Sequence, residues 1–136
     1  MGLWIQISAG SDEPIYAQVA KQISQAIAKG QLLAGDKLPA VRKLAAELVI
    51  NPNTVARAYS RLEQAGLVTT RTGSGTFVSD PKLRSGSAAD INMLAERIDT
   101  IITRGLNLGI EDKDLISMFK TRLSGFVNRQ KGRKKK

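Results

Sequence analysis

GQLLAGDKLPAVRKLAAELVINPNTVARAYSRLEQAGLVTTRTGSGTFV, residues 30–78, contains the clearest structural signals in this chain. Its first half predicts a short helix, because Leu44 and Leu48 lie four residues apart among strong helix formers. Pro39 stands at the entrance of this helix, where a missing N–H costs nothing.

A second helix should follow after a turn of only a few residues. Asn51 is a good N-cap and Pro52 suits the first helical position. The helix is expected over residues 52–65 and should end at Gly66, a typical C-cap residue. Two helices joined this closely predict a helix-turn-helix.

The second helix has one apolar and one polar face. Val55, Tyr59 and Leu62 are spaced i, i+4, i+7 and should face the core. The opposite side carries donors suited to phosphates and base edges: Asn53, Arg57, Ser60, Arg61 and Gln64. The alternative is a polar face that does no more than interact with water.

A β-hairpin is expected directly after Gly66. Residues 67–71 (LVTTR) and 76–78 (TFV) have strand character, and the glycine-rich residues 72–75 (TGSG) form a flexible turn. This turn lacks the Gly-Lys-Ser/Thr end and the helix of a phosphate-binding P-loop. Two helices and a hairpin in this order predict a winged helix-turn-helix, with Arg71 and the hairpin tip able to approach DNA.

These residues resemble the DNA-binding domain of the GntR family of bacterial transcription regulators. The matching positions are Gly35, Leu38, Pro39, Arg42, Thr54, Val55, Gly73, Gly75, Thr76 and Val78. Residues 14–18 (PIYAQ) and 51–59 (NPNTVARAY) are most similar to the YtrA-like branch of that family. The resemblance covers residues 12–78.

The resemblance implies that Arg42 reads a guanine and that Asn53, Thr54 and Gly73 approach bases or backbone. The DNA-binding residues expected in all are Arg42, Lys43, Asn53, Thr54, Arg57, Arg61, Arg71, Thr72 and Gly73.

The chain departs from the family pattern at two positions. Many members have a basic residue where this chain has Ala56, so Arg57 lies about 100° further round the helix. Arg57 is therefore either an anchor in the groove or a phosphate contact. The usual N-cap serine after Leu-Pro is Ala40, which should cost its helix roughly 0.5–2 kcal/mol.

The basic charge is concentrated at the C-terminus. The formal net charge is +9, and residues 129–136 (RQKGRKKK) hold six basic groups and no acid. We expect a disordered tail there that raises DNA affinity without reading sequence. A membrane-surface role is weaker, because the tail has no amphipathic apolar partner.

Neither a metal, a cofactor nor an enzymatic activity is expected. The chain contains no Cys and no His, so zinc, haem and thiol chemistry lack their usual ligands and nucleophile. Asp12 and Glu13 precede a helix and suit its N-terminus. A metal could also be bound by the three carboxylates of Glu111, Asp112 and Asp114. Their place at the start of a predicted helix favours the interpretation that they, too, interact with a helix N-terminus.

The cellular location is expected to be the cytoplasm. The N-terminus has no basic and apolar signal, and no apolar run reaches the length of a membrane span.

The N-terminal residues should support the helix-turn-helix from behind. Residues 15–29 predict an amphipathic helix that ends at Gly30. Leu3, Ile5 and Ile7 alternate as in a short strand, which would pair with the hairpin or with a partner subunit. Trp4 is a buried anchor, a dimer contact or an exposed side chain.

Residues 79–89 predict a linker, and residues 90–128 predict two helices with Asp90 as the first N-cap. The chain should break between Gly105 and Gly109. The apolar stripes of the two helices are Ile91, Leu94, Ile98, Ile101, Leu115, Met118, Phe119 and Leu123. Two short helices bury too little surface to be stable alone. They should pair with those of a second copy, the alternative being that they fold back onto the DNA-binding domain.

The expected fold is therefore mainly α with a small β wing: an N-terminal winged helix-turn-helix over residues 1–78 followed by a two-helix C-terminal dimerisation module. The expected function is sequence-specific regulation of transcription, as a repressor that binds an inverted-repeat operator in double-stranded DNA as a homodimer. A nonspecific or architectural nucleic-acid-binding protein and a winged helix that binds protein are the alternatives. The short C-terminal region leaves a small-molecule effector unknown.

Overall fold

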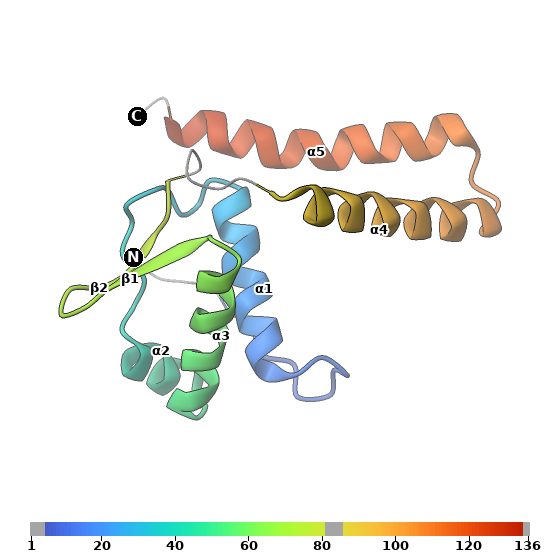
Figure 1. Cartoon of the computed structure of the whole chain (residues 1–136). Coiled ribbons are helices and arrows are strands. Elements are labelled where there is room, and N and C mark those ends of the chain that lie inside the picture. Colours follow the sequence, from blue (N-terminus) through green and yellow to red (C-terminus); the bar gives the residue numbers. More distant parts are fainter. Residues whose placement is uncertain (1–4, 81–85, 135–136) are drawn as a thin grey trace. The chain divides into compact units, whose positions relative to one another are not determined.

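The structure is a computed structural model that describes residues 5–80 and 86–134, with side chains as far as residue 126. The chain divides into two compact units, Met1–Arg84 and Ser85–Lys136, called here the N-terminal and the C-terminal unit. The elements in order are α1 (Ile15–Ala28), α2 (Val41–Leu48), α3 (Pro52–Gln64), β1 (Val68–Arg71), β2 (Gly75–Val78), α4 (Ala88–Asn107) and α5 (Asp112–Lys134) (Figure 1). The expected class, mostly helical with a small β wing, is confirmed.

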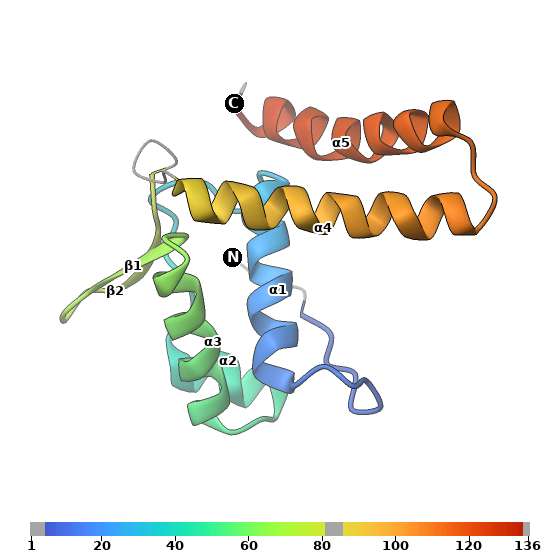
Figure 2. The same cartoon turned by 45° about the vertical axis from the view of Figure 1, so that its right-hand side comes forward.

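The N-terminal unit has a continuous apolar core. In both views α1 and α3 run side by side, and α2 packs on α3 (Figures 1 and 2). The largest fully buried side chains come from these three helices, from the segment before α2 and from β1: Val19, Ile23, Leu38, Leu44, Val55 and Val68. Val55 belongs to the apolar face that the sequence predicts for α3, so that face points into the core.

The turn between α2 and α3 contains an unusual backbone conformation. Val49 caps α2 in the left-handed region, with φ 55°, and its side chain is 88% exposed. Such a φ is a strained conformation for a β-branched residue. The Asn51 side chain then accepts a hydrogen bond of 2.8 Å from the backbone N–H of Asn53, and Pro52 takes the first helical position. The predicted start of α3 is therefore confirmed.

The wing is an antiparallel hairpin in which Val68 pairs with Val78 and Arg71 pairs with Gly75. It projects from the helices of its unit (Figure 1). Lys37, upstream of α2, forms an isolated bridge with Phe77. This bridge ties the base of the wing to the segment that enters the helix-turn-helix.

The described part of the N-terminal segment is not a strand, contrary to the sequence-based expectation. The backbone of Gln6 bonds instead to the side-chain amide of Gln22 on α1, at 2.9 and 2.8 Å. Ile5 and Ile7 pack against the apolar core. Side-chain hydrogen bonds from α1 thus replace the sheet partner, while Leu3 and Trp4 lie outside the described residues.

The C-terminal unit is a helical hairpin of α4 and α5 (Figures 1 and 2). Ser87, not Asp90, is the N-cap of α4. The Ser87 hydroxyl accepts a bond from the Asp90 N–H, and the Asp90 carboxylate accepts one from the Ser87 N–H. Ser and Asp are both favourable N-cap residues. When they lie three positions apart, the first is the N-cap and the side chain of the second completes the capping box.

The break predicted between Gly105 and Gly109 begins later than expected, because α4 runs through Gly105 to Asn107. Gly105 is buried, and a Cβ atom there would lie 2.5 Å from Cδ2 of Leu115. This glycine therefore allows close helix packing, and the turn falls at Gly109, whose φ is 85°.

The ends of the C-terminal unit also differ from the expectation. Ser79 belongs to the N-terminal unit, since its N–H donates to the Leu67 carbonyl, and α4 begins at Ala88, inside the predicted linker. Helix α5 continues to Lys134, although the sequence predicts disorder over residues 129–136. Lys, Arg and Gln are good helix formers, so the local sequence is compatible with a longer helix. None of the helices in the described ranges is long and apolar enough to span a membrane.

Candidate nucleic-acid interface

The N-terminal end of α3 presents polar side chains outside the core. Asn53 is exposed and Thr54 is half-buried, and the buried Tyr59 follows further along the same helix. The Tyr59 hydroxyl donates a 2.7 Å hydrogen bond to the Pro39 carbonyl, and burial raises the pKa of this hydroxyl above its usual range. This bond links α3 to the entrance of α2 and so fixes the two helices of the motif relative to each other.

Helix α2 contributes two exposed basic side chains, Arg42 and Lys43, in its first turn. Ala40 provides no side-chain cap, and the first turn contains no acidic residue. Positive charge at a helix N-terminus is unfavourable with the helix dipole, whereas an anion there is favourable. The end of α2 is therefore an electropositive surface suited to DNA.

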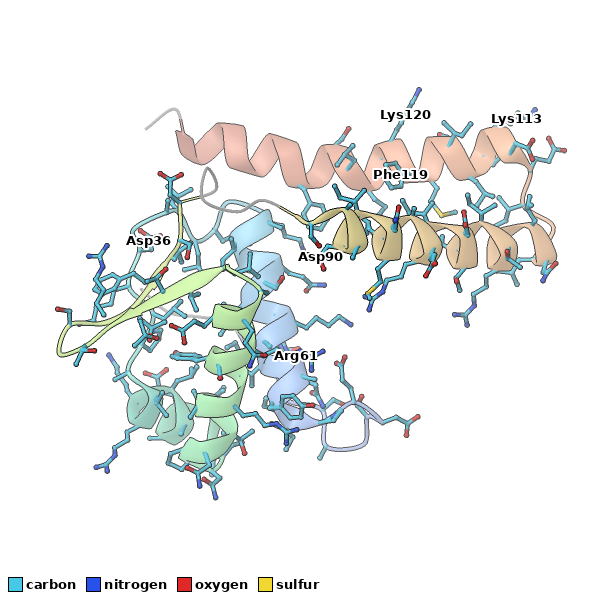
Figure 3. All side chains as sticks on the ribbon, viewed as in Figure 1. Asp36, Arg61, Asp90, Lys113, Phe119 and Lys120 are labelled. Atoms are coloured by element: carbon cyan, nitrogen blue, oxygen red, sulfur yellow. The ribbon has the colours of Figure 1, made fainter. Side chains whose placement is uncertain are left out.

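Arg57 and Arg61 both lie over one aromatic ring. The Arg57 guanidinium carbon is 3.9 Å from the centre of the Tyr16 ring, and that of Arg61 is 5.6 Å away. Together with Ser60 and Gln64, these residues line a pocket of about 310 Å³ on the surface. Figure 3 shows Arg61 leaving α3 on the side of α1. Arg57 is thus held against α1. Its position on α3 alone does not predict this contact.

The wing carries the other predicted DNA contacts. Arg71 lies over the Phe77 ring at 4.7 Å, and Gly73 at the tip has φ 80°. Thr72 and Gly73 are exposed. Glu63 at the end of α3 accepts a 3.2 Å bond from the Thr70 N–H, which attaches the wing to the recognition helix.

Sequence reasoning missed two residues at this surface. Tyr16 holds the two arginines, and only its place in the first turn of a helix, within the PIYAQ run, hinted at a role. Lys37 lies beside the wing, where a Cβ on Gly75 would be 2.7 Å from its Cε. Both contacts depend on packing between segments far apart in the chain.

Among the described residues, no ion pair joins an acid to the exposed basic side chains of this surface: Arg42, Lys43, Arg57, Arg61 and Arg71. Lys113 and Glu111 of the C-terminal unit do form an ion pair, at 3.7 Å. No three Asp, Glu, His or Cys side chains in the described part of the chain gather to hold a metal ion. The arrangement suits recognition of an anionic polymer.

The apolar stripes of α4 and α5 are open to solvent. Ile91, Leu94 and Ile101 on α4 are each at least 60% exposed, as is Phe119 on α5. Ile98, Met118 and Leu123 are 40–50% exposed, while Leu115 packs on Gly105. The helical hairpin therefore presents a large apolar surface.

The sequence is similar to known bacterial regulators. Residues 15–78 match the family described as bacterial regulatory proteins, gntR family. The chain is 36% identical to the HTH-type transcriptional regulator YhcF of Bacillus subtilis, over 85% of this chain and 94% of that protein. It is 37% identical to the HTH-type transcriptional repressor YtrA of the same organism, over 79% and 82%.

Solved structures agree with this similarity. A transcriptional antiterminator from Listeria monocytogenes superposes with a TM-score of 0.78 at 27% identity, covering 88% of this chain and 89% of the other. YtrA from Sulfolobus acidocaldarius, a GntR-family transcription factor, gives 0.57 at 39% identity, covering 76% and 97%. The DNA-binding domain of AraR in complex with operator ORX1 gives 0.52 at 29% identity, covering 58% and 99%.

Proposed function

Because this chain belongs to the GntR family, in its YtrA-like branch, and is a DNA-binding transcriptional regulator, we propose that it represses transcription by binding an inverted-repeat operator as a homodimer. One observation supports this most. The chain combines an exposed basic surface on the helix-turn-helix with exposed apolar side chains on the helical hairpin of α4 and α5.

In the proposed complex, α3 of each subunit enters a major groove. Arg42 reads a guanine, and Asn53 and Thr54 contact base edges or the adjacent backbone, in keeping with their place at the N-terminal end of α3. The wing, through Arg71, Thr72 and Gly73, contacts the flanking backbone or minor groove. The hydrogen bond from the Thr70 N–H of the wing to Glu63 would keep the wing and the recognition helix in a constant register on the duplex.

The homodimer is proposed to form through α4 and α5 of two copies. Burying a large aliphatic or aromatic side chain contributes about 1.5–3 kcal/mol, so the exposed stripes represent a substantial driving force for association. A four-helix arrangement about a two-fold axis would cover them. One recognition helix reads too few base pairs to select a site in a genome, whereas two half-sites multiply the specificity.

Repression is proposed from the geometry of a dimer bound across a promoter and from the similarity to YtrA of Bacillus subtilis, a transcriptional repressor. A dimer that covers a promoter excludes the polymerase. The C-terminal unit would serve to join two copies, with no enzymatic step required.

Selection of binding sites from a random DNA library tests this function. The full chain at about 150 mM salt should enrich an inverted repeat with half-sites about one helical turn or more apart. Binding without enrichment would instead favour a nonspecific architectural protein. Absence of DNA binding would favour a winged helix that binds protein.

Deletion of the basic C-terminal residues provides a second test of this function. Removal of residues 129–136 eliminates six positive charges. It should weaken binding to every sequence alike and flatten the salt dependence, while the enriched motif stays the same. Loss of the motif itself would contradict the assignment of specificity to the N-terminal unit.

A further inference from the structure

The pocket between α1 and α3 has the composition of an anion site. Its volume is about 310 Å³, and its lining side chains are Tyr16, Arg57, Ser60, Arg61 and Gln64. Each of these can donate a hydrogen bond, and none is a carboxylate. A ligand in this pocket would therefore meet positive charge and donors.

The aromatic ring keeps the two guanidinium groups near each other. Their carbons lie 3.9 and 5.6 Å from the centre of the Tyr16 ring. The negative face of the ring attracts both cations, while the cations repel each other. An anion placed beside them removes that repulsion and completes their hydrogen bonding.

The pocket lies away from the base-reading end of α3. Its α3 residues are spaced i, i+3, i+4, i+7 from Arg57 to Gln64 and form one stripe, which faces Tyr16 of α1. In a helix-turn-helix the N-terminal residues of the recognition helix reach base edges, and other surfaces meet the backbone. The stripe is thus placed for phosphate rather than for bases.

We propose that Arg57 and Arg61 form a phosphate clamp that binds the DNA backbone beside the major groove, with Tyr16 as the positioning residue that holds their guanidinium groups. This inference rests on the proposed function. It assigns Arg57 to a phosphate and extends the DNA interface from α3 to the first turn of α1. Asn53, Thr54 and Arg42 then carry the base reading.

The test compares variants in binding to the selected operator and to a random duplex over a range of salt concentrations. Tyr16→Leu removes the ring, and Arg57→Gln removes a charge from an exposed position. Tyr16→Phe keeps the ring and loses only the hydroxyl. Lys21→Gln, an equal loss of charge at an exposed position of α1 outside the pocket, is the control.

Tyr16→Leu should weaken binding to both duplexes by the same factor, roughly two- to fivefold per subunit, the loss expected for one exposed cation–π contact. Tyr16→Phe should lose less. Arg57→Gln should lower the slope of log affinity against log salt by about 0.9 for each phosphate contact removed. Lys21→Gln should retain the wild-type slope.

Three results of this comparison of variants would overturn the inference. If Arg57→Gln weakened only the operator complex, Arg57 would be reading bases. If the wild type bound DNA and both Tyr16→Leu and Arg57→Gln bound as well as it does, the pocket would not touch DNA, and the proposed function would stand without it. A wild type that binds neither duplex would overturn the proposed function together with this inference.

A free anion offers the same kind of oxygen atoms as the DNA backbone. Competition with inorganic phosphate therefore distinguishes the two possible ligands of the pocket. Millimolar phosphate, with ionic strength matched by chloride, should leave the DNA affinity of the wild type unchanged. A phosphate-dependent loss of affinity that is absent in Tyr16→Leu would assign the pocket to a free anion and overturn the backbone assignment.

Discussion

The two units of this chain differ in how far their apolar side chains are buried. In the N-terminal unit, helices, loops and wing enclose a shared core, and its largest side chains, such as Ile23 and Leu44, are entirely buried. In the C-terminal unit, Gly105 is buried, while large side chains such as Ile101 and Phe119 are more than 60% exposed.

This difference separates a unit that is complete by itself from one that is not. The N-terminal unit can hold its polar surface in a defined shape, because the core beneath it is closed. Among its described side chains the C-terminal unit has no such core, so we expect its stability to depend on a further apolar surface. In the proposed function, recognition and association therefore belong to different elements, and substitutions should affect one without the other.

The largest effect should come from a cavity in the closed core. Ile23→Ala removes a side chain with no exposed surface and should cost about 2–5 kcal/mol. Hydrogen exchange of the backbone amides in α1 and α3 measures this loss in the full chain. Ile101→Ala, at a 65% exposed position, should change the stability of those same helices by no more than about 0.5 kcal/mol. Equal losses would mean that the units share one core.

Arg42→Ala should produce the next largest effect, on recognition alone. Loss of a bidentate contact to guanine should cost about 1–3 kcal/mol of binding free energy and relax the preference at one base pair in each half-site. Repeated site selection with the variant measures this directly. A uniform loss on all sequences would show instead that Arg42 contacts phosphate.

Phe119→Gln should weaken association without changing the motif that is read. In Figure 3, Phe119 lies on the side of α5 toward α4, whereas Lys120 lies on the opposite side. Phe119→Gln should lower operator affinity roughly tenfold, about 1.4 kcal/mol, while affinity for an isolated half-site stays constant. Lys120→Gln is the matched control and should behave as the wild type. If the two variants were indistinguishable, the apolar stripe would have no part in binding two half-sites.

The smallest effect concerns the turn between α2 and α3. Val49→Gly should stabilise the N-terminal unit by about 0.5–1 kcal/mol, because glycine relieves the left-handed conformation at the cost of some backbone entropy. Val49→Ala keeps a Cβ atom and should gain less. Thermal unfolding compares the three proteins, and a lower midpoint for the glycine variant would show that Val49 is not strained.

Local patterns predict most of the N-terminal unit. The spacing of Val55, Tyr59 and Leu62, the Asn51 cap and the glycine-rich turn each depend on residues close in sequence, and the structure contains all of these features. The stacking of Arg57 on Tyr16 joins residues more than forty positions apart, as the distance between α1 and α3 along the chain shows. Periodicity within one helix carries no information about such a contact.

The C-terminal unit shows a different limit of sequence reasoning. Gly105 and Gly109 look equivalent as helix breakers, yet Leu115 packs on Gly105 and α4 continues through it. Likewise, Ser87 and Asp90 are both good caps, and their mutual hydrogen bonds decide which one begins the helix. In both cases a tertiary or reciprocal contact overrides the residue preference.

Sedimentation equilibrium of the full chain, alone and with a duplex that carries the selected inverted repeat, distinguishes a dimeric regulator from a monomeric one. If the N-terminal unit reads DNA and the C-terminal unit joins two copies, the protein should be a dimer at micromolar concentration, with two copies on each duplex. A monomer at that concentration, with copies that occupy the two half-sites independently, would contradict the account.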